Sequence, residues 1–184
     1  MELLTIAGNK IVDLTPLAGM KELKVIYLAE NRVGLGGVGI APLAGLKNLE
    51  KLFLAVNWIT DLSALGGLQR LEYIDLNTNQ IESEQLKHLK GLTGLKTINL
   101  GYNKITNPNP LAGIKSLEWL LLYNNLITDP SSLAGLPRLK DLILNSNRIS
   151  SLKGLSELKD LKDLGLWDNS NLTKAEIAKL QKAL

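Results

Sequence analysis

Apolar and polar positions follow one order that recurs from end to end of this chain. The order is Leu-x-x-Leu-x-Leu-x-x-Asn-x-Ile, then a polar step and a second apolar half such as Leu-Ala-Gly-Leu, and residues 117–138 show it complete. Such self-similarity predicts a solenoid, because one coil cannot bury its apolar edge alone and must stack on its neighbours. The asparagine of the pattern occurs eight times, at spacings of 22 to 26 residues: Asn9, Asn31, Asn57, Asn79, Asn103, Asn125, Asn147 and Asn169.

The first half of each repeat predicts a short strand with one buried face. In residues 117–122, Leu120 is expected to point inward, while Trp119 and Leu121 point outward, because side chains alternate along a strand. Asn125 follows where the chain leaves the strand. Its amide can donate to and accept from backbone groups of the adjacent coil, so we predict a buried ladder of eight asparagines.

The repeat divides the chain into eight coils within a single domain, residues 1–184. We predict an α/β solenoid, a right-handed arc or horseshoe whose concave side is a parallel β-sheet. Near the end, Thr173-Lys174-Ala175-Glu176 has the form of a capping box, which predicts a capping helix over about 173–184 with Ile177, Leu180 and Leu184 facing the core. The expected coils are residues 1–22, 23–48, 49–70, 71–94, 95–116, 117–138, 139–160 and 161–184.

The first coil begins the pattern at once, at Leu4 and Ile6, without a polar helix before it. Terminal coils need a cover over their apolar end and over the unpaired strand edge. We therefore expect that a further segment, a partner or a second copy of the chain covers this edge, or that the chain is trimmed or engineered. Self-association through the N-terminal edge is one of these expectations.

The half-repeat Asn-x-Ile-x-Asp-Leu-x-x-Leu-x-x-Leu occurs in residues 9–20, with methionine at its last position, and in residues 57–68. Together with Pro-Leu-Ala-Gly-Leu at 42–46, it resembles the 22-residue class of leucine-rich repeats in bacterial internalins. It is also similar to the leucine-rich-repeat regulatory subunit of protein phosphatase 1. The resemblance implies protein binding on the concave sheet and a bacterial secreted or surface protein, although the helical N-terminal cap of the internalins has no counterpart here.

The amino-acid composition excludes several kinds of site and partner. The chain has no cysteine, so neither a disulfide framework nor a thiolate metal site is available, and we expect no cofactor and no metal. The net charge of +3 is small and scattered, which argues against a nucleic-acid partner. Met1 leads straight into Glu2-Leu3-Leu4, and no apolar run is long enough for a signal peptide or a membrane helix, so we expect no membrane partner.

Two local motifs resemble functional sites, a phosphate-binding loop and a histidine site, but the sequence around them does not favour either function. Residues 34–39 match Gly-x-Gly-x-x-Gly, but a phosphate-binding fingerprint needs a strand and a helix around it, so we interpret the glycines as a flexible bulge on the flank. Residues 83–89 predict a short convex helix with Ser83 as its cap. The only histidine, His88, lies there and has no partner histidine or cysteine, so we interpret it as a surface residue.

The exposed concave positions of each coil are the second, third, fifth, seventh and eighth. The second is charged in every coil, and five of the seven neighbouring pairs are opposite in sign. Because adjacent parallel strands lie about 4.8 Å apart, this row favours lateral pairing, and we interpret it as structural.

Seven of the eight aromatic residues fall at exposed concave positions, and the eighth, Trp58, is expected to pack against the flank. Aromatic residues favour strands in general, but Tyr102, Tyr123 and Trp167 lie beyond the core strand. Solvent-facing rings on a rigid surface mark interaction sites. We predict a ligand-binding surface centred on the third to seventh coils and made of Tyr27, Phe53, Tyr73, Asp75, Asn99, Tyr102, Trp119, Leu121, Tyr123, Ile143, Asn145 and Trp167.

These observations favour a non-catalytic module that binds a protein partner on the concave face. The first alternative is an engineered or idealised repeat scaffold without a natural ligand. The second is a carbohydrate-binding module, because tryptophan and tyrosine faces beside aspartate and asparagine can stack on sugar rings. An enzyme is not expected, since Asp141 and Asp163 lie on adjacent coils but have no histidine, cysteine or serine–base grouping beside them.

Overall fold

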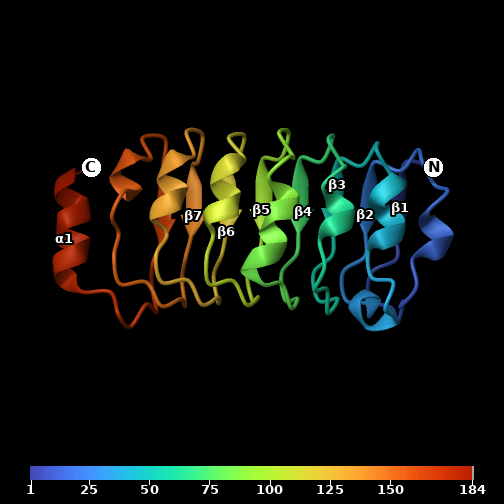
Figure 1. Ribbon diagram of the computed structural model, residues 1–184, viewed down its shortest axis with the longest axis horizontal. Helices are drawn as coiled ribbons and strands as arrows, with labels where there is room; N and C mark the ends of the chain where they lie inside the picture. Colours follow the sequence, from blue (N-terminus) through green and yellow to red (C-terminus); the bar gives the residue numbers. More distant parts are fainter. Residues whose placement is uncertain (184) are drawn as a thin grey trace.

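The computed structural model describes residues 1–183, and over that range the strands form one open sheet of eight parallel strands in chain order. Figure 1 shows the coils side by side from the N-terminal to the C-terminal end. The predicted α/β solenoid is confirmed. The strands are β1 (Leu3–Thr5), β2 (Val25–Tyr27), β3 (Lys51–Phe53), β4 (Tyr73–Asp75), β5 (Thr97–Asn99), β6 (Trp119–Leu121), β7 (Asp141–Ile143) and β8 (Asp163–Gly165).

Short 3₁₀ helices form the side of the solenoid opposite the sheet (Figure 1). They suit the second half of each repeat because a tight turn returns the chain to the next strand within a few residues. The helices are η1 (Thr15–Leu17), η2 (Val33–Gly36), η3 (Ala41–Gly45), η4 (Ser63–Leu65), η5 (Ser83–Leu89), η6 (Asn109–Gly113), η7 (Ser131–Gly135) and η8 (Leu155–Glu157).

The core lies between these two layers and is almost entirely aliphatic. The middle residue of each strand from β2 to β7 points inward and is fully buried, as Leu120 is in β6. Trp119 and Leu121, on either side of it, point out of the sheet and keep part of their surface exposed, as predicted. In-register pairing then places outward residues of successive coils in straight rows, such as Phe53 beside Asp75.

The asparagine ladder is present and explains why the repeat keeps this residue. The Asn125 side chain donates to the Leu100 carbonyl of the preceding coil at 2.9 Å and accepts from the Ile105 N–H at 2.9 Å. Six of the eight asparagines are buried, Asn103 is partly buried, and Asn9 is exposed. The prediction of eight buried residues is therefore wrong at Asn9, whose side chain bonds only carbonyls of its own coil within the described residues, and only partly met at Asn103.

The residue before each asparagine has a left-handed backbone in all eight coils. Its N–H donates to the next coil, as Tyr102 N–H does to the Tyr123 carbonyl at 3.0 Å in one of the seven such bonds. Left-handed backbone favours glycine and asparagine, yet Val56 and Tyr102 adopt it here. The stacking of coils thus imposes a conformation that these residue types do not prefer.

The C-terminal helix α1 (Lys174–Ala183) covers the last coil only in part. Leu180 packs against the core, but Ile177 is 41% exposed, so the prediction that both face the core is wrong for Ile177. Leu184, the third residue predicted for that face, lies outside the described residues. In β8 and just after it, Leu164 and Leu166 stay partly exposed, because α1 packs beside η8 and not over the strand.

The glycine-rich insertion of the second coil forms η2, the blue turn that projects beyond the other coils in Figure 1. Two of its glycines are required for different reasons, Gly34 because the Trp58 backbone lies close to it and Gly37 because its backbone is left-handed. A Cβ on Gly34 would lie 2.0 Å from the Trp58 carbonyl oxygen, and Gly37 has a φ of +71°. The prediction of a flexible bulge therefore missed the close approach that fixes this turn against the third coil.

Ser83 does not cap η5, contrary to the prediction. It is the first residue of the 3₁₀ helix, and its hydroxyl oxygen accepts the N–H groups of Thr106 and Asn107 in the next coil, both at 2.9 Å. The serine thus joins two coils.

Candidate functional site

The row of charges at the N-terminal ends of the strands pairs as the sequence predicted. Glu2 bonds Lys24 and Glu72 bonds Lys96, both at 2.9 Å, and Glu118 bonds Lys140. Each lysine reaches the glutamate of the preceding coil, and these hydrogen bonds lower the pKa of Glu2 and Glu118. Three of the five opposite-sign neighbours in the row thus form ion pairs, whereas Glu50 and Lys162 form none of the ion pairs found in residues 1–183. These three pairs link adjacent coils on the surface.

An aromatic stack forms on the outward face of β1–β8, here called the sheet face. The rings of Tyr27 and Phe53 lie 4.3 Å apart and nearly parallel, at 12°. Tyr73 continues the stack, with its ring 4.8 Å from Phe53 and tilted by 34°. Tyr27 and Phe53 are register partners, and Tyr73 leans from β4 toward them. The structure therefore brings together three rings that are far apart in the sequence.

A second group of rings is built around Tyr123. Its hydroxyl accepts a hydrogen bond from the Asn77 amide at 2.8 Å, although the two residues lie two coils apart. The intervening coil has Gly101 at the equivalent position, where a Cβ would lie 2.4 Å from the Tyr123 ring. Tyr102 meets Tyr123 edge to face, with ring centroids 5.6 Å apart. Gly101 thus makes room for the tyrosine to reach across a whole coil.

Asp75 links the two groups. Its carboxylate accepts the N–H of Asn77 at 2.9 Å, and Asn77 in turn bonds Tyr123. Burial raises the pKa of the Asp75 carboxyl, against the lowering effect of that N–H bond. Burial also raises the pKa of Tyr73, and the Asp75 charge raises it further. We call these seven residues the aromatic cluster: Tyr27, Phe53, Tyr73, Asp75, Asn77, Tyr102 and Tyr123.

Beside the cluster, the sheet face continues with Trp119 and an apolar pair. Trp119 is 38% exposed, and the Lys140 ammonium lies 5.2 Å from its ring centroid. Leu121 and Ile143 follow Asn99 in the same row of register partners, and all three are partly buried.

The two remaining predicted residues lie apart from the cluster. Asn145 accepts the N–H of Trp167 at 3.0 Å and packs over Gly165, where a Cβ would lie 2.8 Å from its side-chain oxygen. Trp167 is 67% exposed, and no ring pair within residues 1–183 includes it. These residues lie at the C-terminal end of the sheet face.

Sequence reasoning missed three residues that shape this surface: Asn77, Gly101 and Lys140. Asn77 and Gly101 occupy the same repeat position as Tyr123. At this one repeat position, three successive coils have a polar residue, a glycine and a tyrosine. That succession could have indicated the hydrogen bond between Asn77 and Tyr123. Lys140 was assigned only to the charged row, although lysine also contacts the face of a neighbouring ring.

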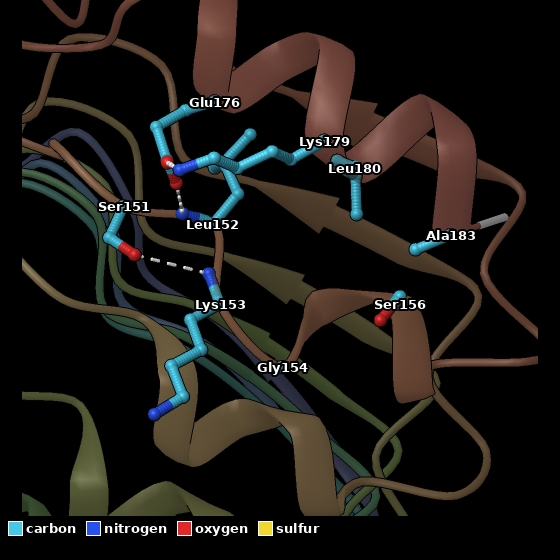
Figure 2. A pocket seen from close by; sticks show the side chains of 9 residues that line it. All are labelled: Ser151, Leu152, Lys153, Gly154, Ser156, Glu176, Lys179, Leu180 and Ala183. Carbon is cyan, nitrogen blue, oxygen red and sulfur yellow. Dashed lines mark hydrogen bonds and ion pairs between the residues drawn. The ribbon is translucent and has the colours of Figure 1, made fainter.

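Two hollows lie away from the sheet face. One, of about 350 Å³, lies between α1 and residues 151–156 of the seventh coil, and Figure 2 shows Glu176 bonded to both Lys179 and the Leu152 N–H at its rim. The other, of about 230 Å³, lies beside Trp58, which is about half exposed on the flank. No residue of the aromatic cluster lines either hollow, although Thr78, at the edge of the second, donates a hydrogen bond to the Asn77 side chain at 2.6 Å.

Within residues 1–183, no group of three or more histidine, cysteine, aspartate or glutamate side chains has a geometry that could hold a metal ion. Asp141 and Asp163 are register partners in β7 and β8, as expected from the sequence. In the described part of the chain, no helix has the length and apolar character needed to cross a bilayer.

Comparisons with known proteins agree with the repeat. A family model described as Leucine Rich repeats (2 copies) matches residues 47–91 and 115–157. Comparison with curated proteins finds no match.

Among solved structures, internalin C2 of Listeria monocytogenes is 33% identical with a TM-score of 0.83, over 89% of this chain and 70% of that one. A leucine-rich-repeat protein of Leptospira interrogans is 31% identical with a TM-score of 0.90, over 100% and 47% of the two chains. Internalin F of Listeria monocytogenes is 25% identical with a TM-score of 0.60, over 94% and 66%. The chain thus spans about half of the Leptospira protein and about two thirds of the internalins. It belongs to the internalin-like family of bacterial leucine-rich-repeat proteins.

Proposed function

We propose that this domain is a non-catalytic module that binds a protein partner through its sheet face, with the aromatic cluster at the centre of the contact. The observation that carries the proposal is the continuity of the cluster across β2–β6. Rings, a carboxylate and an amide are joined there by stacking and hydrogen bonds, and the rings keep part of their surface exposed. Tyrosine and tryptophan are the usual anchors of protein interfaces.

The cluster is also ordered before any partner arrives. Tyr123 is fixed by its bond to Asn77 and by the edge-to-face contact with Tyr102. Binding to side chains that are already held in place loses less conformational entropy than binding to free ones. Preorganised rings on a rigid sheet are therefore suited to recognition of a partner surface.

Similarity to internalin C2 supports the interaction role, since the repeat module covers most of both chains. It also supports a bacterial secreted or surface location as part of this proposal. The predicted self-association through the N-terminal strand edge is a separate proposal, and sedimentation of the purified chain tests it.

A pull-down with matched variants tests the proposal. Tyr123→Ala and Trp119→Ala should each lose a partner that the unaltered chain captures, with an unchanged melting temperature. Trp58→Ala, which removes an exposed ring from the flank, is the control and should retain the partner.

Loss of the partner with Trp58→Ala but not with the sheet-face variants would contradict the proposal. Specific signal on a glycan array without any captured protein would favour the carbohydrate-binding alternative. A chain that binds in neither assay would fit a scaffold without a natural ligand.

A further inference from the structure

The Asp75 carboxylate is half-buried without a cationic partner. Its one hydrogen bond within the described residues comes from the Asn77 N–H, at 2.9 Å. None of the four ion pairs found within 4.0 Å in residues 1–183 includes it. A carboxylate removed from water without a compensating charge is unfavourable, and a cation placed beside it would relieve that cost.

The rings around Asp75 present the right surface for a flat cation. The stack runs along the solenoid from Tyr27 through Phe53 to Tyr73, so Tyr73 has one ring face against Phe53 and the other turned toward the β5 side. Aromatic faces carry the negative part of the ring quadrupole and attract cations. On that same side, the Tyr123 hydroxyl is held near β4 by Asn77.

We infer that the part of the sheet face between Tyr73, Asp75 and Tyr123, here called the slot, receives an arginine side chain of the protein partner. This inference rests on the proposed function and names the chemistry of its central contact. The planar guanidinium can stack on Tyr73 while its N–H groups donate to Asp75. A compact ammonium cannot combine stacking with a two-pronged hydrogen bond, so arginine is favoured over lysine.

A lysine of this chain, Lys51, is the register partner of Tyr73. Lys51 on β3 is exposed, and its ammonium forms none of the ion pairs found in the described part of the chain. The slot is thus open to a cation from outside. Removal of this competing charge by Lys51→Met should leave arginine binding unchanged or strengthen it.

An NMR titration of the full chain with N-acetyl-arginine methylamide tests the inference. The neutral citrulline analogue has nearly the same shape and is the matched probe. The arginine probe should shift the signals of Tyr73, Asp75 and Asn77 in a saturable way, and citrulline should not. Asp75→Asn should weaken the arginine probe by about tenfold or more, as expected for loss of a close charge pair.

Asp163→Asn, which alters an exposed carboxylate of the sheet face outside the cluster, should bind the arginine probe like the unaltered chain. Asp75→Asn should keep or raise the melting temperature, because the carboxylate it removes is half-buried without a cationic partner and the amide oxygen can still accept the Asn77 N–H. Equal shifts by arginine and citrulline, or unchanged binding by Asp75→Asn, would overturn the inference. A captured protein whose affinity is insensitive to Asp75→Asn would reject the arginine slot and leave protein binding intact.

Discussion

The ladder asparagine is the residue that most strictly defines the repeat, because its amide satisfies backbone groups that the turn leaves unpaired. Asn125 donates to three carbonyls, two in its own coil and one in the preceding coil, and accepts one N–H. An apolar residue of similar size would leave these buried groups without partners, which costs more than a lost surface bond.

Replacement of Asn125 by alanine should therefore lower the free energy of unfolding by about 2–4 kcal/mol. The matched control is Asn9→Ala, since Asn9 holds the same repeat position but is exposed and bonds only its own coil. That variant should cost less than about 1 kcal/mol. Urea denaturation of both variants measures the difference, and equal costs would contradict the role of the ladder between coils.

A second feature at the residue scale is the left-handed backbone of the residue that precedes each ladder asparagine. Val56 has a φ of +57° and is 40% exposed, so it combines a conformation that a β-branched side chain disfavours with little burial to offset it.

Val56→Asn should stabilise the protein by roughly 1 kcal/mol, because asparagine tolerates this conformation. For a chain of this length the melting temperature should rise by about 2–4 °C. Calorimetry checks it, with Val25→Asn in β2 as a control that should not stabilise. A lower melting temperature for Val56→Asn would show that contacts of the valine outweigh its strain.

At the scale of elements, α1 packs on the seventh coil, beside η8. Glu176 accepts the Leu152 N–H at 3.3 Å and pairs with Lys179, and these bonds lower the pKa of its carboxyl below the ordinary 4.5. A lowered pKa means that the interaction stabilises the folded helix above about pH 4.5 and is lost as the pH falls through the folded-state value.

Acidification below pH 4.5 should thus loosen α1 while the central coils stay folded. Hydrogen exchange at the Leu152 amide measures this directly, and Glu176→Gln should show fast exchange already at neutral pH. Glu157→Gln, in η8, is the control and should exchange like the unaltered chain. Slow exchange of the Leu152 amide in Glu176→Gln would contradict the proposal that Glu176 holds α1 to this coil.

The strands, the inward leucines and the ladder could be predicted because each depends only on the repeat position, which the sequence displays eight times. Features that depend on two particular coils could not be predicted. The Tyr123–Asn77 bond needs Gly101 between them, and Ser83 accepts N–H groups of the following coil in place of capping its own helix. The partial cover by α1 was missed because an apolar helical face does not indicate where the helix docks.

The candidate surface also has some features that the repeat position predicts and others that depend on particular pairs of side chains. Alternation along the strands predicts that Tyr27, Phe53, Tyr73 and Trp119 share one face, and the four residues lie in β2, β3, β4 and β6. The stack of Tyr27, Phe53 and Tyr73 depends on the lean of Tyr73 out of its own row, and the separation of Trp167 depends on the end of the solenoid. Pairwise side-chain geometry of this kind is not encoded in the position within a repeat.

For the molecule as a whole, the residues that stabilise the fold and the residues that we propose for recognition lie in different layers. The bonds of the asparagine ladder join each coil to its immediate neighbours, so the leucine core and the ladder stabilise the solenoid locally along its length. The sheet face contributes rings and an unpaired carboxylate that the core does not require. This division allows the sheet face to vary with the partner while the fold is kept.

Site-specific photo-crosslinking tests the central claim most directly. The photoreactive residue p-benzoylphenylalanine would replace either Tyr102 on the sheet face, which is 53% exposed, or the exposed Lys87 in η5 on the opposite side. We predict that a partner protein is cross-linked from position 102 and not from position 87, and that Tyr123→Ala abolishes the product. Cross-linking from position 87 alone would contradict recognition through the sheet face.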